Sequence, residues 1–126
     1  MAGERILVVD DNPLNLKVTR LLLVGEGYQV RTAEDSQEAL AILEVFAPHL
    51  ILTDIRMPGM DGLELTRHLR ADPGMKGVII VALTAYAMRG DEERAREAGC
   101  DGYIAKPIDT RSLPQVLRRY LTKAAP

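Results

Sequence analysis

Five polar residues of this sequence stand directly after short apolar runs, and their types belong together chemically. They are Asp10, Asp11, Asp54, Thr84 and Lys106. If the runs are parallel strands of one sheet, the residues that follow them meet at its carboxyl edge, where open α/β proteins bind ligands. Three carboxylates in one crevice repel each other, so a cation between them is the simplest explanation. Oxygen ligands without His or Cys suit Mg²⁺ rather than zinc.

This group of residues predicts phosphoryl chemistry. A carboxylate beside Mg²⁺ and a lysine can attack a phosphoryl group, so one of the three aspartates could act as a nucleophile. Phosphoryl transfer depends on charge neutralisation and in-line positioning, which Mg²⁺ and the Lys106 ammonium would supply. The Thr84 hydroxyl would donate a further hydrogen bond. A competing interpretation assigns one carboxylate to helix capping, since Asp11 or Asn12 could cap the helix that follows them.

The apolar runs themselves predict strands. Three of them are nearly continuous and rich in β-branched residues, which favours strands buried on both faces of a parallel sheet. The expected strands cover residues Arg5–Val9, 28–30, 50–53, 78–83 and Gly102–Ala105.

The stretches between the runs predict helices. Pro13 suits the first turn of the first helix. Asp35 and Asp61 are each followed three residues later by Glu, a capping-box spacing that marks two helix starts. A charged helix is expected over Asp91–Ala98. The last helix has one apolar face, formed by Leu113, Val116, Leu117, Tyr120 and Leu121.

A strand followed by a helix, about five times over, predicts an open α/β sheet with helices on both faces. We expect one domain over residues 1–126, because 126 residues is the size of one ordinary domain.

Composition and charge argue against several other classes. A net charge of -2, from 16 basic and 18 acidic residues, gives no reason to expect nucleic-acid or membrane binding. The single cysteine, Cys100, allows no internal disulfide and fits a reducing, cytoplasmic compartment. We find no signal peptide, and no apolar stretch approaches the roughly 20 residues of a membrane span.

The ordered motifs of the chain resemble those of the response-regulator receiver family, and the resemblance covers essentially the whole chain. The motifs are Val8-Val9-Asp10-Asp11-Asn12, Asp54 with Met57-Pro58 and Asp61-Gly62, Ala82-Leu83-Thr84-Ala85, Gly99-Cys100-Asp101-Gly102-Tyr103, and Ala105-Lys106-Pro107.

The resemblance implies a flavodoxin-like, doubly wound sheet of five parallel strands in the order 2-1-3-4-5, with five helices. It implies that Asp54 accepts a phosphoryl group from a histidine kinase or a histidine phosphotransfer protein. Asp10, Asp11 and Asp54 would bind Mg²⁺ together with the backbone carbonyl of Arg56. Phosphorylation and dephosphorylation would be self-catalysed, so the protein would be a switch rather than an enzyme.

Further roles follow from the same resemblance. Thr84 and Lys106 would contact the phosphoryl group, and Tyr103 would change rotamer on activation. The Lys106–Pro107 bond is expected to be cis. The fourth helix, fifth strand and fifth helix would bind a downstream protein. Residues 84–94 are similar both to single-domain cell-division regulators and to receivers of hybrid histidine kinases, so a receiver module of a phosphorelay is the alternative.

We expect the phosphodonor to dock over the first helix and the loop after the fifth strand, near Pro107 and Ile108. The apolar residues of that helix exceed one core-facing stripe; they are Leu14, Leu16, Val18, Leu21, Leu22 and Leu23. The alternative is a wide stripe that faces only the core.

Two other folds with related chemistry fit less well. A haloacid-dehalogenase-type phosphatase needs a second carboxylate two residues after its nucleophile, whereas Asn12 and Arg56 stand at that offset from Asp10 and Asp54. A flavodoxin needs a first loop rich in Ser, Thr and Gly, whereas this loop is Asp-Asp-Asn-Pro.

Overall fold

The computed structural model describes residues 3–84, 90–106 and 108–124. Within these residues strands and helices alternate as expected. They are β1 (Arg5–Val9), α1 (Pro13–Gly25), β2 (Gln29–Ala33), α2 (Ser36–Leu43), β3 (Leu50–Asp54), α3 (Gly62–Arg70), a 3₁₀ turn (Pro73–Met75), β4 (Ile79–Thr84), α4 (Asp91–Ala98), β5 (Gly102–Ala105) and α5 (Leu113–Ala124). In this described part of the chain, none of the helices has the length and apolar character that crossing a membrane requires.

The strands form one parallel sheet in the order β2-β1-β3-β4-β5, which confirms the predicted fold. β1 and β3 are neighbours although α1, β2 and α2 separate them in sequence, and the register pairs Val9 with Thr53. The residues that follow these two strands therefore meet where the strand order reverses, which is the usual ligand site of such sheets.

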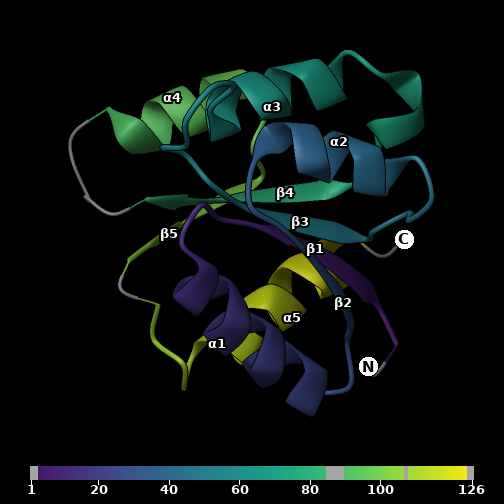
Figure 1. Cartoon of the computed structure of the whole chain (residues 1–126), viewed down its shortest axis with the longest axis vertical. Coiled ribbons are helices and arrows are strands. Elements are labelled where there is room, and N and C mark those ends of the chain that lie inside the picture. The colour runs from purple at the N-terminus through teal and green to yellow at the C-terminus, as the bar shows by residue number, and fades with distance from the viewer. Residues whose placement is uncertain (1–2, 85–89, 107, 125–126) are drawn as a thin grey trace.

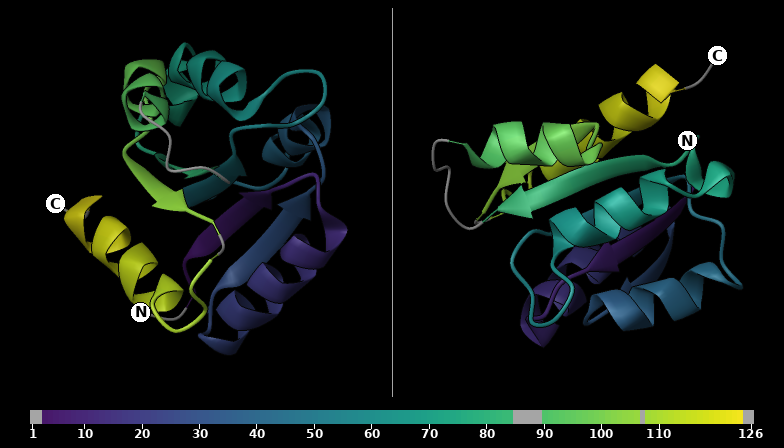
Figure 2. Two further views of the ribbon diagram at one scale, coloured as in Figure 1. Left: turned by 90° about the vertical axis from the view of Figure 1, so that its left-hand side faces the viewer. Right: turned by 90° about the horizontal axis from the view of Figure 1, so that it is seen from above.

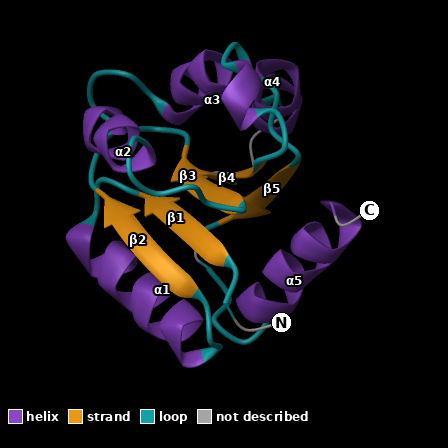
Figure 3. Cartoon of the chain, turned by 90° about the vertical axis from the view of Figure 1, so that its right-hand side faces the viewer, coloured by secondary structure: helices purple, strands orange, loops and turns teal. Residues whose placement is uncertain are grey.

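Two layers of helices cover the sheet. α2, α3 and α4 lie on one side, called here the α4 face, and α1 and α5 lie on the other, called the α1 face (Figures 1 and 3). Figure 2 shows the same two layers from other directions. Alternate strand residues serve separate cores: Ile51 and Ile80 pack on the α4 face, and Leu52 and Val81 on the α1 face. Burial on both faces explains the continuous apolar runs.

The second strand departs from its expected position. Residues 28–30 were expected, but β2 spans Gln29–Ala33, and its residues alternate between exposed and partly or fully buried. It is an edge strand of the sheet, so it needs only one apolar face and carries Arg31 on the other.

Side chains cap the N-terminal ends of α1, α2 and α3. Asn12 accepts hydrogen bonds from two backbone N–H groups in the first turn of α1, at 2.9 and 3.2 Å. Asp35 caps α2 and Asp61 caps α3, as the spacing to the following Glu predicted. Because Asn12 rather than Asp11 caps α1, the capping interpretation does not account for the carboxylates that follow β1.

Arg70 ties the end of α3 to the loop between α4 and β5. Its guanidinium donates hydrogen bonds to the carbonyl oxygens of Gly99 (2.8 Å), Met75 (3.2 Å) and Val78 (2.8 Å). It also pairs with the carboxylate of Asp101 at 2.6 Å. These contacts hold the C-terminal end of α4 against the rest of the fold.

Candidate functional site

Asp10, Asp11 and Asp54 lie together at the carboxyl edge of the sheet, where β1 and β3 end. Each offers one carboxylate oxygen, and these oxygens all lie within 4.8 Å of one another. Asp10 and Asp54 are buried, with exposed fractions of 1% and 6%, whereas Asp11 is exposed. The clustering predicted from the strand ends is confirmed, and we call these three residues the acidic cluster.

Lys106 reaches the acidic cluster from the end of β5. Its Nζ lies 3.0 Å from Oδ2 of Asp10 and 3.0 Å from Oδ2 of Asp54. Its backbone N–H donates to the carbonyl oxygen of Thr84 at 2.6 Å, which fixes the chain leaving β5 beside the end of β4. A single ammonium group therefore bridges the two buried carboxylates.

Backbone amides hold the other oxygens of these carboxylates. The N–H of Asn12 donates to Oδ1 of Asp10 at 3.0 Å. The N–H of Arg56 donates to Oδ1 of Asp54 at 3.3 Å. Both buried carboxylates are thus oriented by the backbone on one side and by Lys106 on the other.

Gly62 allows α3 to begin directly against the end of β3. A Cβ at this position would lie 2.0 Å from the carbonyl oxygen of Asp54. The Gly62 N–H donates to the carbonyl oxygen of Ile55 at 2.8 Å, which locks the same contact. A residue without a side chain is therefore needed to hold the backbone that carries Asp54. The sequence alone presented Gly62 only as part of a motif.

The charges of the site are incompletely balanced. Burial raises the pKa of Asp54, the hydrogen bond and charge of Lys106 lower it only in part, and the charge of Asp10 raises it further. Burial alone would lower the pKa of Lys106, but its hydrogen bonds to Asp54 and Asp10 outweigh burial and raise the pKa above its ordinary value of 10.5. Three carboxylates face one ammonium, a set of oxygen ligands typical of a Mg²⁺ site.

Thr84 lies beside this site but turns toward α4. Its hydroxyl donates to Oδ2 of Asp91, the first residue of α4, at 3.1 Å. Asp91 is buried, with 1% of its surface exposed, and its other carboxylate oxygen pairs with Arg94. The hydrogen bond of Arg94 lowers the pKa of Asp91, and that of Thr84 lowers it further. No pattern in the sequence indicated this contact.

Two arginines stand at the rim of the acidic cluster. Arg56 and Arg94 line a hollow of about 460 Å³ together with Asp11, Met57 and Asp61. Arg94 is distant in sequence and reaches the hollow only because α4 lies beside the carboxyl ends of β3 and β4.

Tyr103 lies in β5, where the register pairs it with Ala82. It lines a hollow of about 220 Å³ between α4, β5 and α5, which places it toward the predicted output surface. The expected cis bond at Lys106–Pro107 and the motif residue Ala85 fall outside the described residues.

Comparison with protein families and with curated proteins gives a consistent result. The family model of the response regulator receiver domain matches residues 6–118. The chain is 40% identical over 121 residues to the polar-differentiation response regulator DivK of Brucella anthropi, covering 96% of this chain and 98% of DivK.

Solved structures are similar over nearly the whole chain. The receiver domain of the sensor histidine kinase PA1611 from Pseudomonas aeruginosa, with a magnesium ion coordinated in its active site cleft, is 39% identical, with a TM-score of 0.86 and coverage of 96% and 99% of the two chains. The receiver domain of the response regulator Ssk1 from Saccharomyces cerevisiae, co-crystallised with the histidine phosphotransfer protein Ypd1, is 27% identical. Its TM-score is 0.89, with coverage of 98% of this chain and 93% of that one.

Proposed function

Because the chain belongs to the response regulator receiver family, we propose that Asp54 is its phosphoacceptor and that Mg²⁺ is its metal ion. The protein is a phosphoaccepting switch rather than a classical enzyme. The observation that carries the assignment to Asp54 is the contact of its carboxylate with Lys106 inside the acidic cluster.

The proposed transfer needs little more than positioning. A carboxylate oxygen of Asp54 attacks the phosphorus of a phosphohistidine, so a P–O bond forms while the P–N bond breaks. The leaving imidazole keeps the electron pair of the broken bond and takes up a proton from solvent. Lys106 already touches Asp54, so a small rotation brings its ammonium to an oxygen of the new phosphoryl group.

The acidic cluster fits the proposed metal ion, because three carboxylates offer more negative charge than Lys106 balances. Asp10, Asp11 and Asp54 would hold Mg²⁺, with the backbone carbonyl of Arg56 as a further ligand. When bound there, Mg²⁺ would neutralise charge on the transferring oxygens.

A hollow beside the site supports the proposed docking of the donor on α1. It measures about 390 Å³ and is lined by Leu14, Asn15, Val18, Thr19, Leu22, Lys106, Ile108 and Thr110. Lys106 is therefore shared between this hollow and the acidic cluster. Leu14 and Val18 are 67% and 45% exposed, so part of the apolar surface of α1 faces away from the core. A histidine kinase or histidine phosphotransfer protein that covers these residues would bring its phosphohistidine to Asp54.

We assign the binding of a downstream protein to α4, β5 and α5. Tyr103 and Tyr120 line the hollow between these elements together with Glu92 and Arg96. Tyr120 packs so closely on β5 that a Cβ at Gly102 would lie 2.1 Å from its hydroxyl oxygen. A shift of α4 would change the shape of this hollow, which makes it suitable for reporting the state of Asp54.

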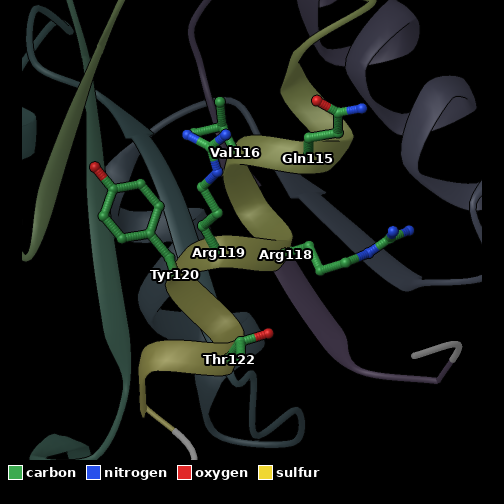
Figure 4. Close-up of a pocket in the computed structure, with 6 residues that line it drawn as sticks. All are labelled: Gln115, Val116, Arg118, Arg119, Tyr120 and Thr122. Carbon is green, nitrogen blue, oxygen red and sulfur yellow. The ribbon is translucent and has the colours of Figure 1, made fainter.

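The outer face of α5 extends this surface. A hollow of about 840 Å³ lies along the helix, and Figure 4 shows its lining residues, Gln115, Val116, Arg118, Arg119, Tyr120 and Thr122. No carboxylate of the acidic cluster lines it, so we assign it to the partner surface. Its two arginines favour an acidic partner, and of the two Arg118 also lies 3.8 Å from the carboxylate of Glu26.

The test of the phosphoacceptor is the mass of the protein after incubation with acetyl phosphate and Mg²⁺. The wild type should gain one phosphoryl group that is labile to both acid and base, as an acyl phosphate is, and Asp54→Asn should gain none. Asp72→Asn is the matched control, because Asp72 only accepts a backbone hydrogen bond in the exposed turn before β4, which Asn can also accept. Equal phosphorylation of Asp54→Asn and the wild type would show that another residue accepts the group.

A further inference from the structure

The contact between Thr84 and Asp91 connects the phosphorylation site with α4. The Thr84 hydroxyl donates to Asp91 at 3.1 Å across the β4–α4 connection. A hydroxyl has one proton to donate. Thr84 therefore cannot donate to Asp91 and to a phosphoryl group at the same time.

Strand alternation explains why Thr84 faces Asp91. Ile80 and Ala82 pack on the α4 face, so Thr84, two residues further, points to that face as well. Leu50 and Leu52 pack on the α1 face, and Asp54 continues that series. The register pairs Asp54 with Leu83, the residue before Thr84. Thr84 is thus adjacent to the phosphorylation site but oriented away from it.

Because α4 has few large apolar side chains in the core, the hydrogen bond from Thr84 to Asp91 matters for its position. The buried residues of α4 are Asp91, Ala95 and Ala98, so small side chains are its apolar anchors. Its N-cap residue, Gly90, has φ +93° and provides no side-chain cap. The described contacts that hold the N-terminal end of α4 therefore depend strongly on Asp91.

We propose that Asp91 competes with the phosphoryl group on Asp54 for the Thr84 hydroxyl and so holds α4 in its unphosphorylated position. This inference rests on the proposed function, since it requires a phosphoryl group at Asp54. Asp91 is a positioning residue that acts through Thr84. When Thr84 turns to the phosphoryl group, Asp91 keeps Arg94 as its partner, so its charge is not left unpaired, and the N-terminal end of α4 is released.

The simpler alternative is that Asp91 only favours the start of α4 through the helix dipole. Glu92 provides the matched control, because it is also an acid in the first turn of α4 but is exposed and pairs with Arg96 instead. Glu92→Ala changes the charge and the dipole interaction in the same way as Asp91→Ala, without touching Thr84.

The experiment measures the affinity of the Mg²⁺-loaded protein for beryllofluoride, a phosphoryl mimic, by amide NMR titration. Losing a competing hydrogen bond of ordinary strength should tighten binding about threefold to tenfold in Asp91→Ala. Asp91→Asn keeps a neutral acceptor, so it should show a smaller change in the same direction and serves if Asp91→Ala folds poorly. Glu92→Ala should match the wild type.

A Thr84→Val background distinguishes an effect through the Thr84 hydroxyl from an effect through Arg94. Valine keeps the shape of Thr84 but has no hydroxyl, so adding Asp91→Ala to Thr84→Val should leave the affinity unchanged. Persistence of the tightening in that background would show that it acts through the released Arg94, and the inference would be wrong. Unchanged or weakened binding by Asp91→Ala itself would also overturn it. Failure of the wild type to bind beryllofluoride would instead overturn the proposed function, and the competition with it.

Discussion

Removing Asp11 should have opposite effects on stability with and without Mg²⁺. Asp11 is the exposed member of the acidic cluster, so Asp11→Ala removes a charge without opening a cavity. Without metal, the substitution relieves repulsion against Asp10 and Asp54 and should stabilise the fold. With Mg²⁺, the same substitution removes a ligand, so the variant should gain less from the ion than the wild type does.

The size of each effect follows from the geometry. The carboxylate oxygens lie at most 4.8 Å apart. Unit charges at that separation repel by about 0.9 kcal/mol in water, and salt screening reduces this to roughly 0.5 kcal/mol per pair. Two pairs, partly offset by Lys106 and by the rim arginines Arg56 and Arg94, give about 0.5–1 kcal/mol. For a chain of 126 residues, this amounts to a rise in Tm of about 2–4 °C in the absence of metal.

Mg²⁺ binding should stabilise the wild type by more than the relief of repulsion stabilises Asp11→Ala. At a Mg²⁺ concentration of about ten times Kd, the wild type should gain about 1.4 kcal/mol, or about 5 °C in Tm. A tenfold loss of affinity would reduce the gain of Asp11→Ala to about 0.4 kcal/mol, or about 2 °C.

The assay is thermal unfolding of both proteins in EDTA and over a Mg²⁺ titration, at fixed ionic strength. Glu97→Ala is the control, because it removes an exposed carboxylate of α4 outside the acidic cluster and should shift Tm equally in both conditions. Two results would refute the expected behaviour: an equal gain from Mg²⁺ in Asp11→Ala and the wild type, or a lower stability of Asp11→Ala than of the wild type in EDTA.

Three further predictions concern docking, backbone packing and pH. Leu14→Ser should slow transfer from a histidine phosphotransfer protein at least threefold while leaving acetyl phosphate labelling unchanged. Val45 is 80% exposed and lies outside this docking face, so Val45→Ser should change neither rate. Equal transfer rates for Leu14→Ser and the wild type would exclude the docking face. Gly62→Ala should destabilise the fold by about 2–3 kcal/mol in urea unfolding, because the new Cβ would overlap the carbonyl oxygen at the end of β3. Gly77 has open space around it, so Gly77→Ala should leave the stability nearly unchanged. A similar loss of stability in both variants would show that the overlap is not the cause. Because the pKa of Lys106 is raised in the folded protein, the stabilisation from its charge is complete below pH 10.5 and is lost as the pH rises through the pKa of the folded state. The difference in unfolding free energy between the wild type and Lys106→Met should therefore narrow above pH 10.5. A difference that stays constant would show that the charge is not the cause.

Much of the fold could be predicted because the sequence patterns are local. The apolar runs located four strands within a residue or two, and the spacing of Asp35 and Asp61 to the following Glu located two helix starts. The clustering of Asp10, Asp11 and Asp54 followed from a single rule about the ends of parallel strands. The second strand was misplaced because an edge strand does not need a continuous apolar run.

What the sequence did not reveal depends on contacts between distant elements. Asp91 looks like an ordinary acid in the first turn of a helix, and only the placement of α4 beside β4 brings it to Thr84. Arg94 reaches the rim of the site for the same reason. The role of Gly62 depends on a backbone approach that no spacing rule describes.

Because of the hydrogen bonds of Arg70, the two ends of α4 are held unequally. These hydrogen bonds hold the loop at Gly99, where the helix ends, whereas at the opposite end the described contacts include the hydrogen bond from the Thr84 hydroxyl to Asp91. We expect a helix held in this way to turn about its C-terminal end, with the larger displacement at the N-terminal end near Thr84. Substitutions of Arg70 would therefore free the C-terminal end of α4 as well. A phosphoryl group could still be accepted, but α4 would no longer move in one defined direction in response.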